Sequence, residues 1–145
     1  MTEDIYLDPS RESFDAFKEL PRDTPINMLN LLRFHEQAQY PDDHPNAALG
    51  WSGARAYQEY GTTSGPVFSR VGGTIIWRGQ MESMLIGPQD KFWDVSFIAR
   101  YPNGGAFMEM ITDSEYKKAV VNRQAAVLTS RLIRFGEIDG PDTFG

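Results

Sequence analysis

Residues 26–34 decide the fold and read Ile-Asn-Met-Leu-Asn-Leu-Leu-Arg-Phe. Side chains alternate between the two faces of a β-strand, so Met28 and Leu32 fall on one face and Leu29 and Leu31 fall on the other. A strand that is apolar on both faces is usually covered on both faces. This stretch therefore predicts a central strand of a sheet.

Further strand-like and helical stretches follow this strand in the sequence. Strands are expected at 73–87, 92–101 and 131–138, and helical stretches at 51–71 and 103–129. The order strand, helix, strand, strand, helix, strand is that of a ferredoxin-like βαββαβ fold, an α+β class with a four-stranded antiparallel sheet. Right-handed crossovers place both helical stretches on the same face of that sheet.

Local signals refine these elements. The run from Gly61 to Pro66 predicts an interruption of the first helical stretch, and Gly79 predicts a bulge or bend in the second strand. Ser52, Asn103 and Asp113 are typical helix caps. Because two of them lie in the second helical stretch, that stretch is expected to divide in two. In 92–101 the apolar row from Trp93 to Tyr101 is expected to face the helices.

The chain is long enough for one domain. We expect an N-terminal helical extension over 1–24, with its helix at 9–20, and a ferredoxin-like domain over 25–138. A tail containing Gly and Pro follows over 139–145.

Composition excludes several classes of function. The net charge of −6 and the lack of a basic cluster argue against nucleic acid and against an anionic membrane surface. No apolar run is long enough to span a bilayer. The chain has no cysteine, so disulfides, thiolate catalysis and cysteine-based zinc sites are excluded. These features, with an acidic N-terminus that does not resemble a signal peptide, lead us to expect a cytoplasmic protein.

A sheet with both helices on one face leaves its other face open. That face is expected to carry the row Asp94, Ser96, Ile98 and Arg100 beside apolar residues of the first strand. Large side chains on an uncovered face indicate an interaction surface. Two such sheets packed face to face form a closed two-fold dimer, so we expect a homodimer.

Several segments resemble the bacterial family called domain of unknown function 1330. They are Pro25 to Phe34, Ala56 to Gly61 with Gly72-Gly73, Trp93 to Pro102, and Ser114 to Tyr116 with Arg123. The resemblance covers about residues 25–134 and implies a dimeric α+β barrel. Shorter members of the family tend to carry Glu-Gly where this chain has Ile86-Gly87. Because the family has no settled activity, the resemblance implies a fold but no reaction.

A barrel of two sheets makes the polar residues between them candidates for a site. The candidates are Asn30, Asp94 and Arg100, with Arg33 and Trp77 near the strand ends. Buried charges need partners. A network that only joins the two subunits would satisfy that need, and so would a bound small molecule.

The two histidines have competing interpretations. His35 and His44 lie in a long loop at 35–50 that also carries acidic residues, but their spacing matches no zinc signature. We therefore expect no metal. His35 directly follows the first strand and is also a candidate general acid or base at the barrel mouth.

Arg123 also has two interpretations. As a position that matches the family, it could bind a substrate carboxylate with two parallel hydrogen bonds. It could equally fasten its helix to the segment that carries Tyr57 and Tyr60.

The sequence therefore predicts a homodimer that binds a small organic molecule without metal or cofactor. Related folds include cofactor-free oxygenases and isomerases, in which His35 or Asp94 would move a proton while Asn30 and Arg100 orient the substrate. The alternative is a non-catalytic module for ligand binding or dimerisation. The sequence leaves open whether the protein is an enzyme.

Overall fold

A computed structural model describes residues 5–144 of the protein. One antiparallel sheet forms its first layer. Its strands are β1 (Ile26–Phe34), β2 (Thr74–Gly79), β3 (Val95–Tyr101) and β4 (Val127–Phe135), in the order β2-β3-β1-β4. The first and third strands are central, and every neighbouring pair is antiparallel. The predicted ferredoxin-like βαββαβ fold of the α+β class is confirmed.

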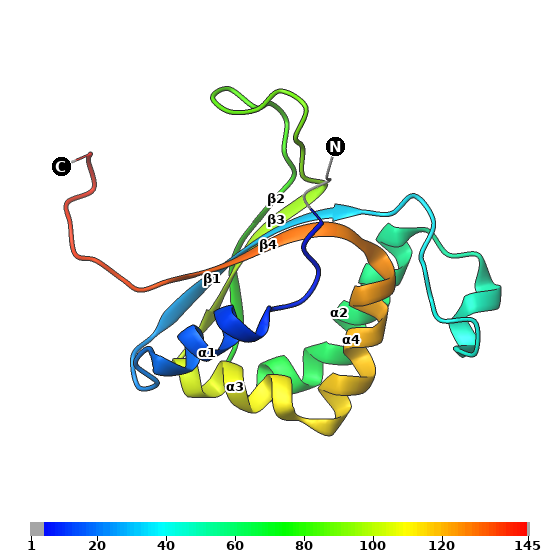
Figure 1. Ribbon diagram of the computed structural model, residues 1–145. Helices are drawn as coiled ribbons and strands as arrows, with labels where there is room; N and C mark the ends of the chain where they lie inside the picture. The colour runs from blue at the N-terminus through cyan, green and yellow to red at the C-terminus, as the bar shows by residue number, and fades with distance from the viewer. Residues whose placement is uncertain (1–4, 145) are drawn as a thin grey trace.

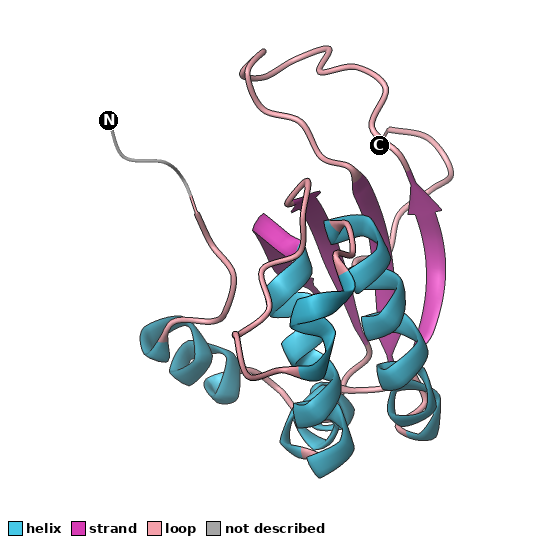
Figure 2. Ribbon diagram, turned by 90° about the vertical axis from the view of Figure 1, so that its right-hand side faces the viewer, coloured by secondary structure: helices cyan, strands magenta, loops and turns pink. Residues whose placement is uncertain are grey.

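The helices form a second layer on one side of this sheet (Figure 1, Figure 2). They are α1 (Arg11–Glu19), α2 (Gly53–Arg70), α3 (Gly104–Thr112) and α4 (Ser114–Ala126). The helices α2, α3 and α4 are capped by Ser52, Asn103 and Asp113 respectively. The side chain of each cap accepts a hydrogen bond from a backbone N–H in the first turn of its helix. The predicted caps, and the division of the second helical stretch, are therefore confirmed.

The core lies between the two layers. Ile26, Met28 and Leu32 of β1 are buried on its helix-facing side, with Ala99 and Tyr101 of β3 beside them. Helical side chains that pack against these strands include Val67, Phe107 and Met110. The row predicted to face the helices does so from Val95 to Tyr101. The prediction is wrong for Trp93, which precedes the strand and contacts Arg131 of β4 instead. This packing leaves the opposite side of the sheet without a helix among the described residues.

The expected interruption of α2 is wrong. The helix runs through Gly61 and Pro66 without a break. Ser64 donates its hydroxyl to the Tyr60 carbonyl at 2.6 Å in the turn before Pro66, and Ser64 and Val67 are buried. Packing of this face outweighs the local preference of glycine and proline.

The boundaries of three strands also differ from the prediction. β2 ends at Gly79, so 80–94 forms a loop, and the register irregularity lies between Ile75 and Trp77. β3 begins at Val95. β4 begins at Val127, where helix was expected to reach 129, and it ends at Phe135. Val127 is fully buried in the core, which favours the strand from that position onward.

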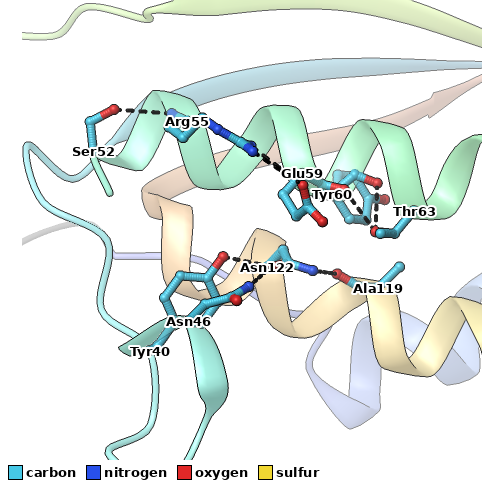
Figure 3. Close-up of polar contacts among 9 residues, drawn as sticks. All are labelled: Tyr40, Asn46, Ser52, Arg55, Glu59, Tyr60, Thr63, Ala119 and Asn122. Atoms are coloured by element: carbon cyan, nitrogen blue, oxygen red, sulfur yellow. Dashed lines mark hydrogen bonds and ion pairs between the residues drawn. The ribbon is translucent and has the colours of Figure 1, made fainter. Parts of the chain in front are cut away.

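The loop at 35–50 is held against α4. Tyr40 donates its hydroxyl to the Asn122 side-chain oxygen at 2.5 Å, and the Asn46 side-chain amide donates to the same oxygen at 3.3 Å (Figure 3). The loop contains a short 3-10 helix, η1 (Pro45–Leu49). The His44 ring stacks on Tyr40 with 4.8 Å between ring centroids. These contacts give the loop a defined position.

Candidate functional site

The strand registers place a row of side chains from every strand on the side of the sheet away from the helices. We call this side the open face; it carries Asn27, Leu29, Leu31, Arg33, Thr74, Ile76, Trp77, Ser96, Ile98, Arg100, Thr129, Arg131, Ile133 and Phe135. Several of the large apolar side chains remain exposed, including Ile76 at 52% and Phe135 at 49%. Apolar surface of this kind marks an interaction site more often than a free surface.

Part of the open face is hollowed. The hollow has a volume of about 360 Å³ and is lined by Asn27, Leu29, Ile76, Ile98 and Phe135. Its walls are mostly apolar, and the Asn27 amide supplies a polar group. Ligand pockets usually measure about 300–1,000 Å³ and combine apolar walls with a few polar groups. The hollow therefore has the composition of a small-molecule site, although it is open on the side away from the sheet.

Two arginines lie on the open face at the other end of β1. The Arg33 guanidinium lies 4.1 Å from the centroid of the Phe92 ring. The Arg131 guanidinium lies 4.7 Å from the Tyr6 ring and 5.4 Å from the Trp93 ring. Within residues 5–144, neither guanidinium has a carboxylate within ion-pair distance. We call this pair the arginine end of the open face.

The third arginine of the open face is paired. Arg100 forms an ion pair and a hydrogen bond with Glu137, and it also donates to the Asn27 side-chain oxygen at 3.4 Å. The hydrogen bond from Arg100 holds the pKa of the Glu137 carboxyl below its usual range. Arg100 is therefore already occupied within one chain.

Asn30 and Asp94 lie in different surroundings from those expected. Asn30 is buried on the helix-facing side of β1, where its amide donates to the Met28 carbonyl at 3.1 Å. Asp94 precedes β3, and its carboxylate accepts the backbone N–H of Phe34 at 2.8 Å. The expected position of Asn30 between two sheets is thus wrong, because its row of β1 faces the helices.

Trp77 and His35 lie apart from each other. Trp77 is 51% exposed on the open face, opposite Ile98. His35 follows β1, and its backbone N–H donates to the Ala126 carbonyl at 2.9 Å. Across the described part of the chain, no group of three or more His, Cys, Asp or Glu side chains is placed to hold a metal ion.

Arg123 fastens a segment that neither interpretation anticipated. It is buried in α4 and donates to the Leu7 carbonyl at 2.6 Å and to the Ser130 hydroxyl at 3.2 Å. The backbone carbonyl of Tyr6 accepts the N–H of Ser130 at 2.8 Å. From the helix side of the sheet, Arg123 therefore secures the N-terminal segment along the edge of β4.

A tyrosine pair lies between the helices and the sheet. The hydroxyls of Tyr60 and Tyr116 are 2.8 Å apart, and burial raises the pKa of both groups. Phenols with raised pKa values stay protonated at neutral pH and do not act as bases. Their hydrogen bond joins α2 to α4.

The candidate list missed Arg131, Ile76 and Phe135. Alternation along 131–135 places Arg131, Ile133 and Phe135 in one row, but the sequence does not show which row faces the helices. The irregularity between Ile75 and Trp77 hides the orientation of Ile76. The register with β1 resolves the first ambiguity, and the place of Ile76 in the lining of the hollow resolves the second.

The fold and the open face define a class: ferredoxin-like α+β domains with helices on one side of the sheet. The family model for a domain of unknown function, DUF1330, matches residues 49–134. The chain therefore belongs to the DUF1330 family. None of the curated proteins matches this chain.

Solved structures agree with that assignment. A protein of unknown function from Rhodopseudomonas palustris, RPA0582, is 50% identical; the match covers 94% of this chain and 99% of that one, with a TM-score of 0.86. The methylated form of RPA0582 matches at 48% identity over 97% of this chain and 100% of that one, with a TM-score of 0.88. SnoaB, a cofactor-independent oxygenase from Streptomyces nogalater, is 13% identical over 83% of this chain and 99% of that one, with a TM-score of 0.52. This last likeness shows the shared fold alone.

None of the described helices is long and apolar enough to cross a membrane.

Proposed function

We propose that a second copy of the chain packs on the open face, and that the homodimer holds a small organic molecule over the hollow. The observation that carries this proposal is the hollow itself, which has apolar walls and an open side on an exposed sheet face. A two-fold partner would bring the same apolar surface to the same place. It would close the open side and add its own hollow to the enclosed volume.

Two segments extend beyond the sheet on the side away from the helices. They are the loop at 80–94 and the tail at 136–144 (Figure 1). Leu85 is 88% exposed and Ile86 is 91% exposed at the tip of the loop. Apolar side chains this exposed in a single chain favour burial against another molecule. The dimer gives them a surface to contact.

Binding is a better supported activity than catalysis. Asn30, Asp94 and Arg100 are engaged by the Met28 carbonyl, the Phe34 N–H and Glu137. The side chains that line the hollow include no general acid or base. If the protein is an enzyme, we propose a cofactor-free oxygenase or isomerase. The fold that the chain shares with SnoaB supports this second proposal.

We also propose that the protein works in the cytoplasm, because a chain without cysteine has no need of an oxidising compartment.

A thermal-shift screen against small apolar and amphipathic metabolites tests the ligand proposal. A molecule that binds the folded state raises the unfolding midpoint. Phe135→Ala removes one wall of the hollow and should reduce that shift, whereas Leu49→Ala should leave it unchanged. Leu49 is a matched control because it is 52% exposed in η1, away from the sheet. If no compound moves the midpoint, or both variants respond as the wild type does, the ligand proposal is wrong.

A further inference from the structure

The open face is unusual in its charge. Within the paired strands its ionisable side chains are Arg33, Arg100 and Arg131. The Asp94 carboxylate lies just before β3, where it accepts the backbone N–H of Phe34. The chain as a whole has a net charge of −6. The strands of this face therefore carry positive charge on a chain that is acidic overall. Arg100 is neutralised by Glu137, which leaves the arginine end as the cationic part of this face.

Aromatic rings restrict the two guanidiniums of the arginine end. Arg33 packs on Phe92, and Arg131 is held by two rings and by a hydrogen bond of 2.9 Å from its side chain to the Ser130 carbonyl. Stacking on a ring limits the movement of a guanidinium while leaving N–H groups at its edge. An ordered guanidinium loses less entropy when it binds a carboxylate in bidentate fashion.

Covering the open face makes these charges costly. This step rests on the proposed dimer. A cation that loses water needs a counter-charge. In a two-fold interface the same surface meets itself, so the strands of the partner would bring further arginines and no carboxylate. The counter-charge must come from a bound anion or from acidic residues of the segments that extend beyond the sheet.

The hollow indicates what the rest of such an anion would be. Leu29 in the hollow and Arg33 at the arginine end lie on one row of β1, four residues apart. Four residues of a strand span about 13 Å. We propose that the ligand is an organic acid, with its carboxylate at Arg33 and Arg131 and its apolar body extending over the hollow.

Calorimetric titration of the full chain tests this ligand class with matched probes. The acids are hexanoate, octanoate, 3-phenylpropionate and 4-phenylbutyrate, and each is compared with its primary amide. We expect at least one acid to bind about tenfold or more tightly than its amide, because only the carboxylate accepts charge-assisted bonds from both arginines. Arg33→Gln and Arg131→Gln should each weaken acid binding by about tenfold and leave amide binding unchanged.

Two further variants separate charge from geometry. Arg131→Lys keeps the charge but loses the planar fork, so its acid affinity should fall between those of the wild type and Arg131→Gln. Arg78→Gln is the control, because Arg78 pairs in register with Phe97 on the helix-facing row. It should bind the acids as the wild type does.

Light scattering on the same samples shows whether the proposed dimer or the proposed acid ligand has failed. A monomeric wild type overturns the proposed dimer, and this inference with it. A dimer that binds acids and amides equally, or binds neither, overturns the inference alone. A third outcome also overturns the inference: the wild type binds no acid, and Arg33→Gln or Arg131→Gln loses the dimer. The arginines would then pair with acidic residues of the partner.

Discussion

At the residue scale, Arg123 shows how a charged residue can be structural. Its guanidinium is buried and hydrogen-bonded to the Leu7 carbonyl and the Ser130 hydroxyl. Arg123→Met would leave both acceptors without this donor. We expect the free energy of unfolding to fall by about 2 kcal/mol, as measured by urea denaturation.

The control for this change is Lys117→Met on the same helix. Lys117 is exposed, so its replacement should alter stability by no more than about 0.5 kcal/mol. Equal stabilities of the two variants would contradict the structural role of Arg123.

Single residues were the least predictable level from sequence. Asn30 was a natural site candidate because it interrupts an apolar strand, yet a carbonyl two residues away satisfies its amide. Arg123 matched a family position, but its partners are far away in sequence, at Leu7 and Ser130. Side-chain hydrogen bonds depend on tertiary neighbours that residue type and spacing do not specify.

At the element scale, the start of α2 depends on the absence of a side chain. A Cβ at Gly53 would lie 2.2 Å from the His35 carbonyl oxygen and 2.8 Å from the Ala126 carbonyl oxygen. Both contacts are with backbone atoms, which cannot rotate away. Gly53→Ala should therefore lower stability by about 2–3 kcal/mol in urea denaturation.

Gly61→Ala is the matched control in the same helix. A Cβ at Gly61 would meet nothing within 4 Å. Alanine is the better helix former, so this change should raise stability by about 0.5–1 kcal/mol. A stable Gly53→Ala variant would show that α2 does not approach β1 and α4 as closely as described.

Elements were predictable where local chemistry and tertiary packing agree. The caps at Ser52, Asn103 and Asp113 follow from residue type alone, and each accepts the expected backbone bond. Local preference and tertiary packing disagree at Pro66 and at Val127. The helix α2 continues through Pro66, and β4 begins at the buried Val127. The local preferences of these residues carry no information about how the helix or the strand packs in the core.

At the scale of the whole molecule, the order of elements was enough to predict the sheet. A βαββαβ order with right-handed crossovers allows few topologies, and the apolar residues on both faces of β1 select a central position for it. The same reasoning predicts the open face. What covers that face is a property of two molecules, so the homodimer stays a prediction that rests on the exposed apolar side chains.

Multi-angle light scattering at micromolar concentration tests the central claim most directly, which is that a second copy covers the open face. We expect a wild-type mass of twice the 16.4 kDa chain. Ile76→Glu places a charge on the open face and should yield the 16.4 kDa monomer, whereas Leu49→Glu, at an equal exposure of 52%, should remain a dimer. A wild-type mass of 16.4 kDa, or an Ile76→Glu variant that stays dimeric, would contradict the account.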